Sequence, residues 1–134
     1  MLHDQKPALE GAQANLKVIL IVEDDPDLGE ALVYALSHKP NYRIFLATDG
    51  FAALKFVRHI KPHLFILKHR LPKMNGYVLY HRLHALRELE AIPAFLVSTN
   101  LEDDEGAMEN CKLMALSTPL HLDSFLSLVE GVLA

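Results

Sequence analysis

Short apolar runs alternate along the chain with longer stretches in which apolar residues recur every three or four positions. The runs 18–22, 64–67 and 94–97 are wholly apolar and contain β-branched or aromatic residues, as strands buried on both faces of a sheet do. The runs 43–47 and 113–116 have a similar character, although the first begins with Arg43. The pattern therefore predicts five strands.

Helices are predicted between these strands. The stretch from Pro26 to Leu36 begins with a proline that suits a first helical turn, and Pro40 follows its end. Stretches 51–60, 77–89 and 121–133 carry apolar residues at helical spacing. A weaker helix is expected at 101–110, where Gly106 and a poor apolar stripe count against it. Residues 1–15 are polar and aperiodic, so we expect a flexible leader before one domain, 16–134.

Strands that alternate with helices in this way predict an α/β fold. Apolar strands joined by helices form a parallel sheet covered by helices on both faces. In such sheets ligand chemistry lies at the carboxyl ends of the strands. The candidate residues therefore directly follow the predicted strands, and they are Glu23, Asp24, Lys68, Ser98, Thr118 and Pro119.

Four segments of the chain resemble the response-regulator receiver (CheY-like) family of two-component signalling. The similar segments are 18–28 (VILIVEDDPDL), 61–76 (KPHLFILKHRLPKMNG), 92–98 (IPAFLVS) and 117–123 (STPLHLD). They occur in the family's order with ordinary spacing, and the resemblance covers about 17–133. It implies a flavodoxin-like, doubly wound sheet with strand order 2-1-3-4-5. It also implies a role in phosphorelay signal transduction.

The resemblance assigns a position to each candidate residue. The family transfers a phosphoryl group to an aspartate at the end of the third strand, next to Mg²⁺ held with the help of an acidic pair. Glu23 and Asp24 occupy the acidic-pair positions, and Ser98 occupies the hydroxyl position after the fourth strand. Pro119 matches the proline of the family's Lys-Pro segment and is a candidate for a cis peptide bond.

Three positions depart from the family pattern. Lys68 stands at the phospho-acceptor position, and Thr118 stands at the position of the lysine in the family's Lys-Pro segment. Ala115 stands at the position of the aromatic residue that takes part in the family's conformational switch. A lysine ammonium forms no acyl phosphate and repels Mg²⁺. We therefore expect no phosphorylation at the usual position, no cofactor, and weak or absent Mg²⁺ binding. Lys68 is expected to pair with Asp24 or Glu23 instead and to hold the domain in one state as a protein-binding surface.

Net charge and composition argue against some classes of binding partner. The 134 residues carry a net charge of −4, which argues against a general nucleic-acid binder. Cys111 is the one cysteine, so no intrachain disulfide forms, and no apolar run has membrane-span length. These features predict a cytoplasmic protein with no membrane or nucleic-acid contact. The expected partners are a histidine kinase or an output protein, with a homodimer through the 101–133 face as a further expectation.

Two other functions stay open at this point. One is a receiver that is phosphorylated on another residue, or in which Lys68 is a recent or engineered change. The other is a flavodoxin-like enzyme that binds a nucleotide or flavin. The acidic run after the first strand disfavours the enzyme, because carboxylates there repel phosphate. An enzymatic function is therefore not expected.

Overall fold

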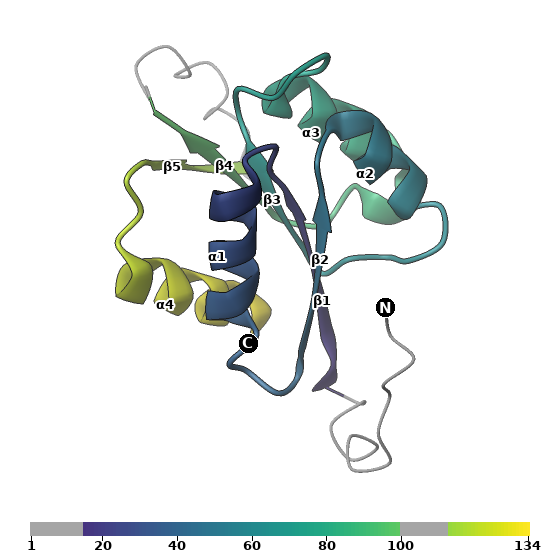
Figure 1. The fold of residues 1–134 in the computed structure, drawn as a ribbon. Coiled ribbons are helices and arrows are strands. Elements are labelled where there is room, and N and C mark those ends of the chain that lie inside the picture. Colours follow the sequence, from purple (N-terminus) through teal and green to yellow (C-terminus); the bar gives the residue numbers. More distant parts are fainter. Residues whose placement is uncertain (1–14, 100–112) are drawn as a thin grey trace.

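The computed structural model describes residues 15–99 and 113–134. Its strands form one sheet in the order β2-β1-β3-β4-β5, and every neighbouring pair is parallel (Figure 1). This arrangement confirms the predicted α/β class and strand order. The strands are β1 (Lys17–Val22), β2 (Tyr42–Ala47), β3 (Leu64–Lys68), β4 (Ala94–Ser98) and β5 (Leu113–Ser117).

Helices cover both faces of the sheet. On one face lie α1 (Pro26–Leu36) and α4 (Leu122–Leu133), and on the other lie α2 (Gly50–Phe56) and α3 (Gly76–His84) (Figure 1). None of the helices within 15–99 and 113–134 combines the length and the apolar character needed to cross a membrane.

Side-chain caps begin three of the helices that follow strands in the chain. The Asp25 carboxylate accepts hydrogen bonds from the backbone N–H groups of Asp27 and Leu28, at 3.0 and 3.4 Å. Asp49 caps α2 and Asn75 caps α3 in the same way. A capped N-terminus satisfies otherwise unpaired N–H groups, which lets α1 and α2 begin within a few residues of the preceding strand, whereas α3 follows a loop after β3.

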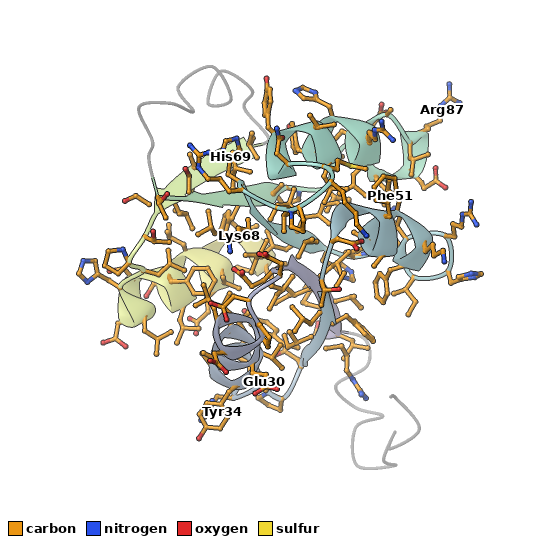
Figure 2. All side chains as sticks on the ribbon, turned by 45° about the horizontal axis from the view of Figure 1, so that its top comes forward. Glu30, Tyr34, Phe51, Lys68, His69 and Arg87 are labelled. Atoms are coloured by element: carbon orange, nitrogen blue, oxygen red, sulfur yellow. The ribbon has the colours of Figure 1, made fainter. Side chains whose placement is uncertain are left out.

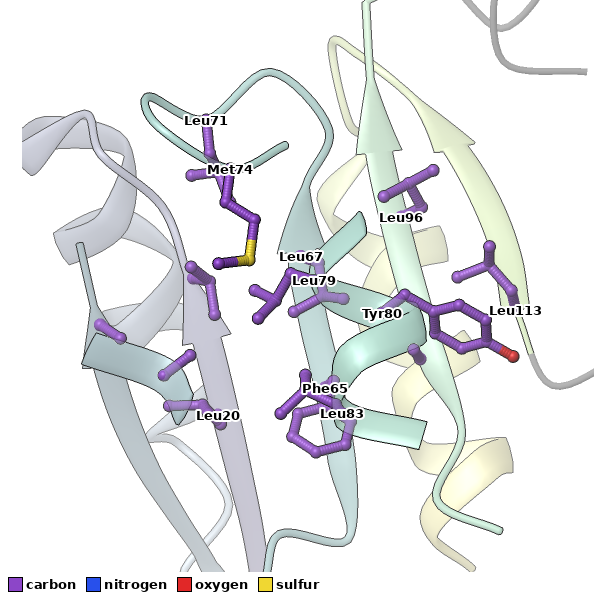
Figure 3. Close-up of a cluster of buried hydrophobic side chains, with 14 of the residues drawn as sticks. Leu20, Phe65, Leu67, Leu71, Met74, Leu79, Tyr80, Leu83, Leu96 and Leu113 are labelled. Atoms are coloured by element: carbon purple, nitrogen blue, oxygen red, sulfur yellow. The ribbon is translucent and has the colours of Figure 1, made fainter. Parts of the chain in front are cut away.

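Alternation along the strands divides the core into two clusters. Residues such as Leu20, Phe65 and Leu96 point toward α2 and α3 and pack against Tyr80 and Leu83 (Figure 3). Their neighbours in sequence point to the opposite face. There the buried residues of α1, α4 and the strands form the second cluster, which includes Ile19, Ile21, Ile66, Phe95, Phe125 and Val129.

Two predicted helices are shorter than expected. The helix predicted at 51–60 ends at Phe56, where N–H groups bond carbonyls three residues back and tighten the chain into turns. The helix predicted at 77–89 ends at His84 and is followed by a separate 3₁₀ turn, η2 (Arg87–Leu89). Leu86 is extended between them, which buries Leu89 and exposes Leu86. The leader up to residue 14 and the helix expected at 101–110 lie outside the described residues.

Candidate functional site

The pairing of β1 with β3 brings two chemically opposite strand ends together. Val22 lies beside Leu67 in the sheet, so the next residues, Glu23 and Lys68, leave the strands side by side. Lys68 Nζ donates hydrogen bonds to Glu23 Oε2 at 3.0 Å and to Asp24 Oδ1 at 2.8 Å. The ion pair expected from the sequence is therefore present, and it engages both carboxylates. Figure 2 shows Lys68 at this edge, with His69 directed away from it.

Burial makes this contact important for the Glu23 carboxylate. The Glu23 side chain is 4% exposed, whereas those of Lys68 and Asp24 are 28% and 37% exposed. Oε2 of Glu23 also accepts a hydrogen bond from the backbone N–H of Asp25 at 3.0 Å. A buried carboxylate is costly unless it is paired and hydrogen-bonded. Lys68 supplies the positive partner that this carboxylate needs.

The pair also shifts the titration of its more exposed members. The hydrogen bond from Lys68 lowers the pKa of Asp24, although partial burial opposes the shift. The hydrogen bond to Asp24 raises the pKa of Lys68, again against partial burial. Both shifts favour the charged forms, so the ammonium and the Asp24 carboxylate stay ionised through the neutral range.

The other candidate residues lie on β4, on β5 and directly after β5. Thr118 directly follows β5, its backbone N–H donates to the Ser98 carbonyl at 3.0 Å, and the Thr118–Pro119 peptide bond is cis. Ser98 is buried at the end of β4. Ala115 is half-buried within β5, opposite Leu96. Of these residues, Thr118 and Pro119 line the same cavity as Glu23 and Lys68.

The loop after β3 holds the Lys68 backbone in place. The N–H of His69 donates to the Val97 carbonyl, and the N–H of Gly76 donates to the His69 carbonyl, both at 2.8 Å. A Cβ atom added at Gly76 would lie 2.2 Å from the Lys68 carbonyl oxygen. Position 76 therefore tolerates only glycine unless the end of β3 moves. The sequence shows Gly76 only as the last residue of the 61–76 segment and gives no sign of this packing role.

The residues present do not fit a divalent cation at this edge. Mg²⁺ prefers several oxygen ligands in octahedral geometry. Here the Lys68 ammonium already contacts the two carboxylates that would bind it. Within 15–99 and 113–134, no group of three or more His, Cys, Asp or Glu side chains is arranged to hold a metal ion.

A cavity that the sequence does not reveal adjoins the pair. It measures about 820 Å³ and lies between α1, α4 and the sheet. Its lining is mostly apolar, with Glu23, Lys68 and Thr118 among its polar members. Whether two helices leave such a space depends on how far apart they pack, and the apolar pattern of each helix does not encode that distance.

Comparison with known proteins establishes the family. The family model of the response regulator receiver domain matches residues 19–118. The chain belongs to this family. Among solved structures, the receiver domain resembles the signal receiver domain of a signal transduction histidine kinase from Syntrophus aciditrophicus. The two are 28% identical with a TM-score of 0.78, and the match covers 87% of this chain and 89% of the other.

Curated relatives place similar receiver domains within longer proteins. The chain is 31% identical over 91 residues to the sensor histidine kinase TmoS of Ectopseudomonas mendocina, which covers 68% of this chain and 9% of TmoS. It is 34% identical over 109 residues to protein-glutamate methylesterase/protein-glutamine glutaminase 1 of Syntrophus aciditrophicus, which covers 75% of this chain and 30% of that enzyme. The chain thus spans less than a third of either relative.

Proposed function

We propose that this receiver domain signals through protein–protein contact and is not phosphorylated at the family's usual position. The observation that carries the proposal is the position of Lys68. Its ammonium lies at the end of β3, hydrogen-bonded to Glu23 at 3.0 Å and to Asp24 at 2.8 Å. The resemblance of the 61–76 segment to the family's third strand and following loop supports Lys68 as the phospho-acceptor position.

The chemistry of an ion-paired ammonium supports this proposal. A carboxylate oxygen attacks phosphorus and forms an acyl phosphate, but an ammonium nitrogen has no free electron pair. The pKa of Lys68 is raised by its hydrogen bond to Asp24, so deprotonation to a nucleophilic amine is disfavoured. The same positive charge repels a divalent cation from the two carboxylates. We therefore propose that Mg²⁺ binds weakly or not at all.

The ion pair also supports a domain held in one state. In a phosphorylated receiver the charge at this edge changes with the signal. Here the opposite charges belong to side chains of the chain itself, and they stay in contact without a phosphoryl group. We propose that the domain presents a fixed surface to its partners.

The described part of β5 and α4 offers apolar contact area for such partners. Met114 is 42% exposed, Leu122 is 51% exposed and Leu128 is 37% exposed. Exposed apolar groups that lie near one another commonly mark protein–protein contacts. We propose a histidine kinase, an output protein or a second copy of the chain as the protein that contacts this face.

The test is the intact mass of the protein after incubation with acetyl phosphate and MgCl₂. We expect no labile phosphoryl group on the wild type and one such group on Lys68→Asp, which restores a carboxylate at the end of β3. Lys73→Asp is the matched control, because it makes the same charge change on a side chain that is 66% exposed. A phosphoryl group on the wild type that maps to the cleft would contradict the proposal.

The same experiment addresses the alternative that Lys68 is a single recent or engineered change. The retained acidic pair, Glu23 and Asp24, favours this alternative. Phosphorylation of Lys68→Asp alone shows that one position disables an otherwise complete cleft. If neither protein is modified, Thr118→Lys is added to Lys68→Asp, because the missing lysine is then the next cause to test.

A further inference from the structure

The two helices that cover one face of the sheet enclose a cavity together with it. Near their carboxyl ends, Lys39 Nζ lies 3.0 Å from Glu130 Oε2 and links the end of α1 to α4. The cavity of about 820 Å³ extends along α1 as far as His38, next to that pair, and reaches Glu23 and Lys68 at the carboxyl ends of the strands. This volume falls in the range of small-molecule sites, roughly 300–1,000 Å³.

The walls and floor of the cavity are apolar. Leu28 and Leu32 of α1 face Leu122 and Leu126 of α4 across it, and strand residues form the floor. Water that fills an apolar space finds few hydrogen-bond partners there, so an apolar occupant is favoured over water.

Two polar residues of the lining, Tyr34 and His38, are exposed, and the other polar groups lie at the end of the cavity beside the ion pair. Glu23, Lys68 and Thr118 line this end. The Lys68 ammonium already serves two carboxylates, so the group of Glu23, Asp24 and Lys68 has an excess of one negative charge. An anionic ligand would be repelled, and a cationic one would compete with Lys68. An uncharged ligand with one hydrogen-bonding group fits best.

The depth of the cavity favours a small molecule over a partner helix. Ile66 and Val97 line the floor, yet they are only 1% and 7% exposed, so the floor is narrow. A helix with its side chains is roughly 10 Å wide and would rest on the rim. A flat or elongated small molecule can enter between the helices and contact their apolar side chains, although little strand surface is open to it.

We infer that the cavity between α1 and α4 binds an uncharged, mainly apolar small molecule whose single polar group lies beside Glu23, Lys68 and Thr118. Such a ligand would touch the ion pair directly and would reach the site without any phosphoryl transfer. The inference does not rest on the proposed function, because the cavity is formed by the helices and the sheet whatever the state of Lys68.

The test uses the full chain and the neutral fluorescent probe N-phenyl-1-naphthylamine, which has an apolar body and one N–H group. We expect a saturable fluorescence increase at one probe per chain and a higher melting temperature in its presence. Ala35→Phe places a ring into the cavity from α1, and we expect it to weaken probe binding by roughly tenfold or more. If Ala35→Phe does not fold, Ala31→Phe, at another lining residue, replaces it.

The matched control is Ala85→Phe, which adds the same ring at an exposed residue after α3. Probe binding should be the same in this control as in the wild type. The inference is overturned if the wild type shows no saturable binding, or if Ala35→Phe binds the probe as tightly as Ala85→Phe does. It is also overturned if the mass in solution shows a dimer that Ala35→Phe dissociates, because a second copy would then fill the cavity.

Discussion

Residues that alternate along the same strands enter two different environments on the two faces of the sheet. On the α2–α3 face, apolar side chains fill the space, and the loop after β3 closes it with Leu71 and Met74 (Figure 3). On the α1–α4 face, the buried cluster is interrupted by a cavity of about 820 Å³. Glu23 and Lys68 line the open face. Both faces therefore bury apolar side chains that stabilise the fold, but the α1–α4 face also leaves room for contact with a ligand or partner.

On the α2–α3 face, which we call the closed face, a substitution should reduce stability most where the loop after β3 touches the end of that strand. In Gly76→Ala, the new Cβ would lie 2.2 Å from the Lys68 carbonyl oxygen, which is backbone and cannot rotate away. We expect the free energy of unfolding to fall by about 3 kcal/mol, as measured by urea unfolding. Gly131→Ala is the control, since a Cβ at that position meets nothing within 4 Å. A similar stability for both variants would show that the face is looser than described.

The ion pair should produce the next largest effect. Lys68→Ala leaves the buried Glu23 carboxylate without its positive partner and close to Asp24. We expect a loss of about 2 kcal/mol in the free energy of unfolding. Lys39→Ala is the matched control, because the Lys39–Glu130 pair is about half exposed and should contribute little. Equal melting temperatures for Lys68→Ala and the wild type would remove the support for a stabilising pair.

A direct test of the two faces introduces the same side chain on each. Ala53 in α2 is fully buried in the closed cluster, whereas Ala35 in α1 lines the cavity. We expect Ala53→Leu to lower the free energy of unfolding by about 1–2 kcal/mol through overpacking, and Ala35→Leu to leave it unchanged or slightly raised. Thermal unfolding of both proteins measures the difference. The comparison breaks down if Ala35→Leu is the less stable of the two.

The smallest expected effect on stability lies at the edge of the sheet where β1 and β3 begin. The Val18 N–H donates to His63 Nδ1 at 2.9 Å, which requires that this nitrogen carry no proton. Partial burial, with Lys17 and Lys61 nearby, lowers the pKa of His63. The unfolded chain therefore takes up this proton more readily than the folded chain does. The contribution of His63 to stability is therefore fully present above its pKa in the unfolded chain, about 6.5. This contribution is lost as the pH falls through the lower pKa of His63 in the folded chain.

We expect this loss to stay under about 1 kcal/mol, because solvent screens the charge on the exposed His63 side chain. The measurement is the free energy of unfolding of the wild type and of His63→Gln as the pH falls from neutral to acidic. The variant should show the shallower pH dependence. An identical pH dependence would assign the titration to other groups.

The arrangement of the sheet follows closely from the sequence. Strands buried on both faces appear as continuous apolar runs, and the ends of adjacent parallel strands meet at one edge. The contact between Lys68 and the acidic residues after β1 was predictable for this reason. Helix ends were less predictable. The apolar spacing of 77–89 continues through Leu86 and Leu89, although the chain is extended at Leu86.

Other features depend on distances between elements. The cavity depends on how α1 and α4 pack on the sheet, and the composition of their apolar faces is compatible with open or closed packing. The close approach of Gly76 to the Lys68 carbonyl is also a tertiary contact. Lys73 adopts a positive φ of 69°, a conformation that a lysine rarely adopts, so its residue type gave no sign of this turn.

The central claim is that the Lys68 ammonium takes the place that a divalent cation would otherwise occupy beside Glu23 and Asp24. Isothermal titration calorimetry with MgCl₂ on the wild type and on Lys68→Asp tests it most directly. We expect no saturable heat for the wild type and a saturable binding heat for the variant, in which a third carboxylate replaces the ammonium. Mg²⁺ binding by the wild type as tight as by Lys68→Asp would contradict it.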